Sequence, residues 1–103
     1  MTEIDDVETE LRRVVDRLTS MPLAKAEQSL DMTHHAAALI LEQTRLIDPM
    51  IPAGATVPRV SVSAAGAQLA VLGNDYLEAV RGMPNAQVTP VLDELVSLRR
   101  SLP

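Results

Sequence analysis

The chain has 103 residues and a formal net charge of −5, and it contains one Tyr but no Phe, Trp or Cys. Without Cys it cannot form a disulfide, a thiolate zinc site or a Cys-ligated iron–sulfur cluster. The negative charge and the near absence of aromatic rings argue against a nucleic-acid-binding surface, which combines clustered Lys and Arg with stacking side chains.

The length is that of one domain, since most domains hold roughly 100–150 residues. No apolar run approaches the roughly 20 residues that a membrane span needs, so we expect no contact with a membrane. The segment from Met1 to Asp6 is acidic, whereas a secretory signal is basic and then apolar. The expected location is therefore the cytoplasm.

The first predicted helix spans residues 3–20. Thr2 and Asp5 have the spacing of a capping box, which favours a helix start at this point. The apolar side chains recur at alternating intervals of three and four residues, which places them on one face of a helix. A seam this regular is typical of close helix packing. We expect that interface at Val7, Leu11, Val14 and Leu18.

The second predicted helix spans residues 23–47 and follows Pro22. Apolar residues occupy most of its circumference, including the unbroken run from Ala36 to Leu41. A helix that is apolar on most sides must be covered by several neighbours. We expect it to be the central helix of the domain, or a helix that faces a second subunit.

The two histidines lie on this predicted helix, next to acidic residues. Asp31 and His34 have the carboxylate-x-x-His spacing that helical bundles use in metal sites, where two helices each supply one such motif. Only one copy of the motif is present, so a symmetric dimer would have to supply the second. The candidate metal ligands are Glu27, Asp31, His34 and His35. The sequence favours a solvated or satisfied pair of histidines, with a metal site as the alternative, and we expect no cofactor.

Residues 48–60 form the one long connection, with prolines at 49, 52 and 58. Each proline disfavours helix at or just before its own position. Loops of this length are often functional or serve as crossovers. We expect an extended spacer across one end of the domain.

The third predicted helix spans residues 62–82 and carries a stripe of small residues: Ser63, Gly66, Ala70 and Gly73. Each interior Gly costs a helix roughly 1 kcal/mol relative to Ala. The stripe therefore indicates that something approaches the backbone closely, either a tightly packed neighbouring helix or a docked ligand or partner helix. The sequence Gly73-Asn74-Asp75 could break this helix, but we expect one kinked helix.

The last predicted helix spans residues 90–102 and opens with Pro90, since proline is tolerated in the first turn. These elements predict an all-α fold with a single helical domain over residues 1–103. The expected architecture is a four-helix bundle with a long, proline-containing connection between the second and third helices.

No motif for catalysis or phosphate binding is present in the sequence. We therefore expect a non-enzymatic helical protein-interaction module that self-associates, most simply as a homodimer. The regular seam, the wide apolar arc and the small-residue stripe together favour this hypothesis. A second protein is a further candidate partner. The alternatives are a bundle that binds a small ligand or a metal, and a small enzyme subunit with a pocket beside the third helix.

Overall fold

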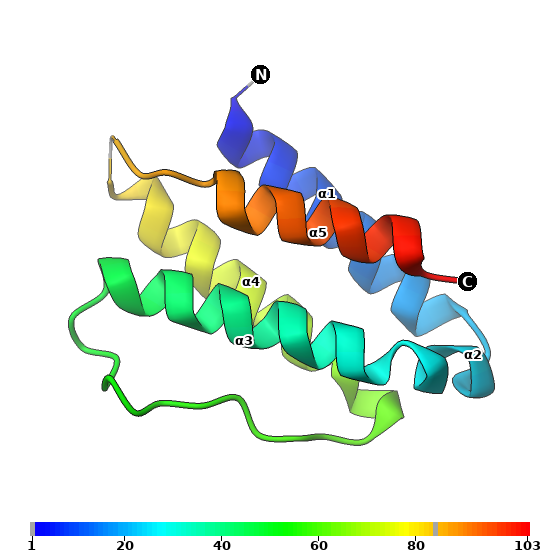
Figure 1. Ribbon diagram of the computed structural model, residues 1–103. Coiled ribbons are helices and arrows are strands. Elements are labelled where there is room, and N and C mark those ends of the chain that lie inside the picture. The colour runs from blue at the N-terminus through cyan, green and yellow to red at the C-terminus, as the bar shows by residue number, and fades with distance from the viewer. Residues whose placement is uncertain (1, 84) are drawn as a thin grey trace.

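The computed structural model describes residues 2–83 and 85–103, and this part of the chain folds into five helices without a strand (Figure 1). The helices are α1 (Glu3–Ser20), α2 (Leu23–Gln28), α3 (Leu30–Ile47), α4 (Val62–Arg81) and α5 (Thr89–Ser101). The predicted all-α class is confirmed. The four-helix bundle is not confirmed, because the count is five. Among these helices none is both long enough and apolar enough to cross a membrane.

The additional helix results from a break at Ser29, so the prediction of a single helix over residues 23–47 is wrong. The Ser29 amide donates to the carbonyl of Ala26, three residues back, at 3.0 Å. This is the hydrogen bond of a tightened turn, which ends α2 before α3 begins. Ser29 is buried there, and its hydroxyl has no hydrogen-bond partner among the described residues.

The start of α1 agrees with its sequence. The Asp5 amide donates to Thr2 Oγ1, and the Thr2 amide donates to the Asp5 carboxylate, each at 3.2 Å. The predicted capping box is thus confirmed. The Thr2 amide, with a smaller contribution from the Thr2 side chain, lowers the pKa of Asp5 because it stabilises the charged carboxylate.

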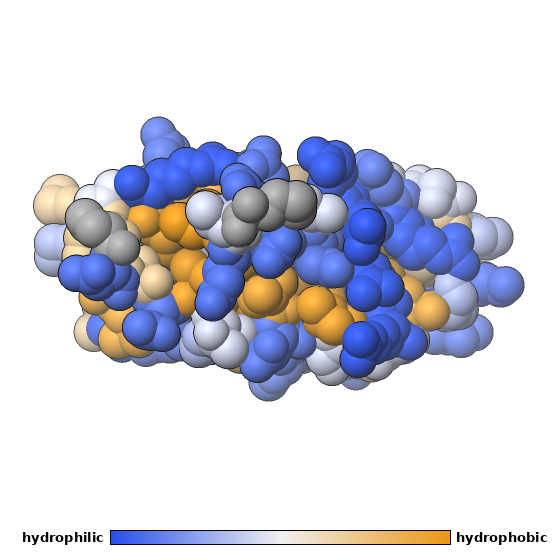
Figure 2. Space-filling model, turned by 90° about the horizontal axis from the view of Figure 1, so that it is seen from above, coloured by the Kyte–Doolittle hydropathy of each residue, from blue (hydrophilic) through white to orange (hydrophobic). Residues whose placement is uncertain are grey.

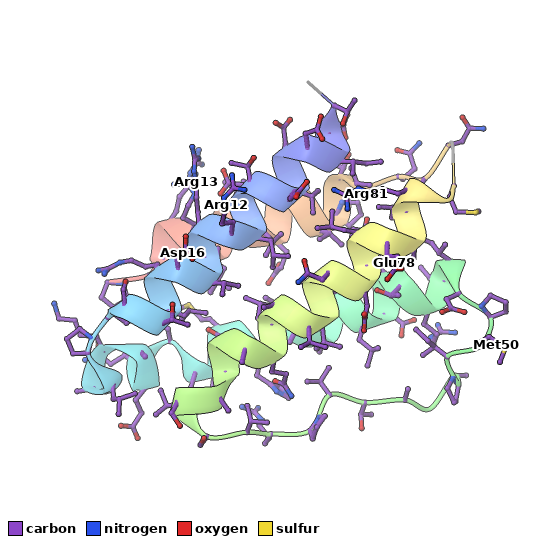
Figure 3. The ribbon with its side chains drawn as sticks, turned by 180° about the vertical axis from the view of Figure 1, so that it is seen from behind. Arg12, Arg13, Asp16, Met50, Glu78 and Arg81 are labelled. Carbon is purple, nitrogen blue, oxygen red and sulfur yellow. The ribbon has the colours of Figure 1, made fainter. Side chains whose placement is uncertain are left out.

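The four long helices form two layers, with α1 and α4 in one and α3 and α5 in the other (Figures 1 and 3). α1 packs on α4 and α5, and α3 packs on the same two helices, so α1 and α3 lie diagonally opposite each other. The molecule is flat, with Cα extents of 40 × 34 × 16 Å. α3 and α4 run in one direction, while α1 and α5 run in the other (Figure 1).

This topology corrects the expectation for the long connection. Because α3 and α4 are parallel, the chain must return along the whole length of α3 before α4 begins. The connection is therefore a crossover along the α3/α4 edge and not a spacer across one end (Figure 1). Val57, which belongs to the crossover, is buried. Gln68 Nε2 donates to the carbonyl of Pro58 at 2.9 Å, and Arg59 Nη1 donates to Asp31 Oδ1 at 2.8 Å, which ties the crossover to both helices.

The core lies between the two layers and is built from aliphatic side chains around the aromatic ring of Tyr76. The seam of α1 is buried in it, opposite residues of the other long helices: Ile40, Leu69, Tyr76, Leu77, Val80, Val91, Leu95 and Leu98. Tyr76 is almost completely buried, and its hydroxyl has no hydrogen-bond partner within the described ranges. Burial raises the pKa of Tyr76, since the phenolate would lose its solvation.

The most enclosed helix is α4, whereas the sequence predicted a central helix over residues 23–47. Seven residues of α4 are buried, against five of α3. Two of those five are threonines, Thr33 and Thr44, whose hydroxyls donate to carbonyls four residues back at 2.8 Å. Polar residues thus take core positions on α3, while the apolar Leu46 is left exposed. α4 itself is continuous through Gly73.

Candidate functional site

The predicted metal ligands are divided between two helices. Glu27 lies on α2, and the other three lie on α3. Asp31 pairs with Arg59 of the crossover at 2.8 Å. His35 is exposed, and its Nε2 atom lies 3.7 Å from Glu94 Oε1 on α5. His34 is half-buried and lines a small hollow beside the crossover.

Within the described ranges, no group of three or more His, Cys, Asp or Glu residues lies close enough together to hold a metal ion. One chain therefore does not bring the four candidate ligands together as a metal centre. A site completed by a second chain stays a prediction.

The small-residue stripe of α4 faces α1. A Cβ atom on Gly66 would lie 3.1 Å from Thr19 Cγ2, and a Cβ atom on Gly73 would lie 2.5 Å from Leu11 Cδ2. The residues proposed for the interface on α1, Val7, Leu11, Val14 and Leu18, are all buried in the core of the same chain. Two of the three features that suggested a dimer, the seam and the stripe, are therefore occupied by packing within one chain.

A shallow hollow of about 260 Å³ lies beside Ala70, where the enzyme alternative places a pocket. Its polar lining comes from four side chains of α1 and α4: Glu8, Arg12, Asp16 and Asn74. Figure 3 shows Arg12 and Asp16 on α1, on the same side of the molecule as Arg81 of α4. Arg81 Nη2 donates to Glu8 Oε2 at 2.7 Å, so this acid already forms an ion pair that joins the two helices.

A larger groove, of about 790 Å³, runs between α1 and α5. It lies on the edge of the molecule opposite the crossover (Figure 1). Viewed from above, apolar side chains are visible along the middle of this edge, between rows of polar ones (Figure 2). Leu92 and Val96 of α5 line the groove, and each is half-buried. These two residues are one turn apart, next to the face that carries Val91 and Leu95 into the core.

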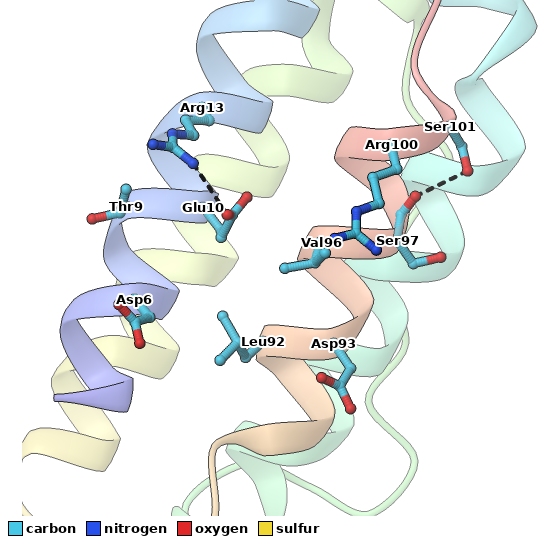
Figure 4. Close-up of a pocket in the computed structure, with 10 residues that line it drawn as sticks. All are labelled: Asp6, Thr9, Glu10, Arg13, Leu92, Asp93, Val96, Ser97, Arg100 and Ser101. Carbon is cyan, nitrogen blue, oxygen red and sulfur yellow. Dashed lines mark hydrogen bonds and ion pairs between the residues drawn. The ribbon is translucent and has the colours of Figure 1, made fainter.

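The charges of this groove are ordered along its length (Figure 4). Asp6 on α1 and Asp93 on α5 line one end, and Arg13 and Arg100 line the other. On each helix the acid and the arginine are seven residues apart, which is close to two turns and so places them on one face. Because α1 and α5 run in the same direction, both acids lie at one end and both arginines at the other.

One ion pair between the helices and one within α1 support the middle of the groove. Arg99 Nε donates to Glu10 Oε2 at 2.5 Å, and Arg13 Nη1 lies 3.4 Å from Glu10 Oε1. Asp6, Asp93 and Arg100 make no ion pair within the residues that the structure describes. These three charges therefore remain available to a molecule that docks in the groove.

The sequence did not predict this groove. The acid and the arginine two turns apart on two separate helices were a readable signal, but the sequence gives no sign that these helices are parallel neighbours. No known protein family matches the chain, and no curated protein and no solved structure is significantly similar to it. The groove offers carboxylates, guanidinium groups and hydroxyls around an apolar floor.

Proposed function

We propose that this protein is a non-enzymatic helical protein-interaction module that self-associates, and that the α1/α5 groove is the surface through which it does so. The observation that carries the proposal is the apolar floor of this groove. Leu92 and Val96 are only half-buried, and they line a groove of about 790 Å³. Two further helices laid over the groove would cover this floor in the manner of a helical bundle.

The opposite edge of the molecule supports this interpretation. There the groove between α3 and α4 is covered by the crossover, through residues such as Arg59 and Val60. The hollow left at this place is about 10 Å³. The same two-layer architecture thus has one edge that the chain closes with its own connection and one edge that stays open. A second copy is the simplest cover for the open edge, because it brings a surface of matching shape and composition.

The size of the molecule also fits a dimer. A standard interface covers about 800 Å² on each partner. That area is roughly an eighth of the 6031 Å² accessible surface of this chain. Two of the residues that line the groove, Leu92 and Val96, are aliphatic, and the lining covers about two turns or more of both α1 and α5.

The test replaces Val96 with a charged residue. We expect the mass of the wild-type protein measured by light scattering to increase with its concentration, from that of an 11.1 kDa monomer towards twice that value. Val96→Glu should remain monomeric, because burying a carboxylate on the groove floor removes apolar contact and costs more than a pair with Arg100 would return. Val71→Glu is the matched control, since Val71 is 60% exposed on α4 and does not line the groove.

Circular dichroism should show that both variants remain helical, so that a loss of dimer is not a loss of fold. The proposal fails if the wild-type chain shows only the monomer at high micromolar concentration. It also fails if Val96→Glu dimerises as strongly as Val71→Glu.

A further inference from the structure

The ordered charges of the groove restrict how a second copy can dock. Asp6 and Asp93 lie at one end, and Arg13 and Arg100 lie at the other. Figure 4 also shows Thr9 and Glu10 of α1 level with Val96 and Ser97 of α5. The halfway point between the acid and the arginine therefore falls at the same height on both helices. The groove thus has a midpoint near Glu10 and Val96, with the two acids on one side and the two arginine positions on the other. The Arg100 side chain reaches back from its position towards Val96 (Figure 4).

Two symmetric arrangements place one groove face to face with another. In the first, the two-fold axis runs along the helices, so that α1 of one copy lies over α5 of the other and all four helices are parallel. Asp6 then faces the partner's Asp93, and Arg13 faces the partner's Arg100. Like charges meet at both ends, which is unfavourable.

In the second arrangement the two-fold axis crosses the helices at the midpoint of the groove, in the plane between the two copies. Each helix then lies antiparallel to its own counterpart. Asp6 faces the partner's Arg13, and Asp93 faces the partner's Arg100. The same spacing of seven residues on both helices brings all these pairs into register at once. Opposite charges meet four times in the dimer. Glu10 lies beside the axis and faces its own counterpart, and its charge is balanced within its own chain by Arg99 and Arg13.

We propose that a second copy of this chain occupies the α1/α5 groove in the antiparallel orientation, held in register by contacts of Asp6 with the partner's Arg13 and of Asp93 with the partner's Arg100. This inference rests on the proposed self-association and adds its geometry. The apolar floor supplies the affinity, and the charges select the orientation, because each exposed ion pair contributes little by itself while repulsion disfavours the alternative. The register also places Ser97 close to the two-fold axis, opposite its own counterpart.

The first experiment measures the orientation. The natural chain has no Cys, so a single introduced thiol reports on one position. We expect Ser97→Cys to form a covalent dimer upon mild oxidation or with a short bis-maleimide, because its counterpart lies across the axis. Ser101→Cys is the matched control, because Ser101 also lines the groove but lies beyond its midpoint. In the antiparallel dimer the two copies of this residue would be about nine residues apart along the helix, which at about 1.5 Å per residue is roughly 13 Å. In the parallel arrangement Ser97→Cys would face α1 of the partner and would not link to itself.

The second experiment measures the charge pairing by light scattering or sedimentation. The double variant Asp6→Arg/Asp93→Arg should dimerise at least about tenfold more weakly than the wild type, because all four contacts become like-charged. The double variant Arg13→Glu/Arg100→Glu should be weakened for the same reason. An equimolar mixture of the two variants should regain affinity, since opposite charges then face each other again.

The outcomes separate this inference from the proposed function. If the wild type dimerises and Val96→Glu abolishes the dimer, but Ser97→Cys does not cross-link or charge reversal has no effect, the antiparallel orientation is wrong and self-association stands. If the wild type is monomeric throughout, both are wrong. Cross-linking of Ser97→Cys but not of Ser101→Cys, together with recovery in the mixture, would support the antiparallel dimer.

Discussion

Replacing Gly73 with alanine would place a new methyl group against the most tightly packed part of the α1/α4 contact. The Cβ atom would lie 2.5 Å from Leu11 Cδ2 and 2.6 Å from Leu11 Cδ1. Leu11 is only 4% exposed and also lines the hollow beside Ala70, so a side chain that moves aside must leave its packed position in the core. Overpacking of this kind costs about 1–3 kcal/mol, while the better helix propensity of alanine contributes about 1 kcal/mol. We expect a net loss of about 1 kcal/mol of unfolding free energy.

The same substitution at Gly66 should have the opposite sign. Its Cβ atom would lie 3.1 Å from Thr19 Cγ2, and Thr19 is an exposed residue that can shift by a few tenths of an ångström. The helix-propensity gain should then prevail, so that Gly66→Ala stabilises the protein by up to about 1 kcal/mol. Two glycines on one stripe of one helix thus serve as controls for each other.

Urea unfolding followed by far-ultraviolet circular dichroism measures both changes, and it needs no tryptophan. A double-mutant cycle locates the cause. If Leu11 is the obstacle, Gly73→Ala should cost less when it is combined with Leu11→Val than it does alone. Equal stabilities of Gly66→Ala and Gly73→Ala, or a cycle without coupling, would refute the proposed steric conflict with Leu11.

Four further outcomes are expected. Tyr76→Phe should stabilise the protein by about 1 kcal/mol in urea unfolding, because it removes a buried hydroxyl that has no hydrogen-bond partner among the residues that the structure describes. Burial raises the pKa of Tyr76. The contribution of the neutral Tyr76 side chain to the free energy of unfolding is therefore complete below the unfolded-state pKa of about 10, and it is lost as the pH rises through the folded-state value. Unfolding at a series of alkaline pH values should show this loss in the wild type and less of it in Tyr76→Phe. Thr2→Ala should lower the melting temperature by removing a helix cap worth roughly 1 kcal/mol. Because the pKa of Asp5 is lowered, the charged Asp5 carboxylate contributes to the free energy of unfolding at neutral pH. This contribution is lost as the pH falls through the folded-state pKa, which lies below 3.8. Acid titration of the Thr2→Ala variant should show a smaller loss of stability.

The elements that the sequence predicted well are those with local signals. The alternating spacing of apolar residues and the capping box at Thr2 predicted α1 over the residues that it occupies. The glycines of α4 predicted a close approach to its backbone, and the structure places α1 there. The break at Ser29 has no such signal, since serine and its neighbours are all compatible with a continuous helix.

The direction and adjacency of the helices could not be predicted, because they depend on the path of the long connection. A spacer across one end would have made α3 and α4 antiparallel neighbours, whereas the crossover makes them parallel. The path of the connection also determines whether the groove forms, since the groove exists only where α1 and α5 lie side by side. Asp6, Val96 and Arg100 therefore remained ordinary helix positions in the sequence, and their common placement appeared only in the structure.

The diagonal placement of α1 and α3 has a consequence for the order of events during synthesis. α1 is made first, but its packing partners are α4 and α5, and the side chains of Thr89 and Glu3 that meet in the folded chain are 86 positions apart. The apolar seam of α1 therefore stays exposed to solvent until α4 and α5 have left the ribosome. Helical domains of this size usually fold quickly because their contacts are local, whereas distant pairing slows folding and prolongs exposure of apolar surface. A nascent chain halted within α4 should consequently be the species of this protein that is most dependent on chaperones.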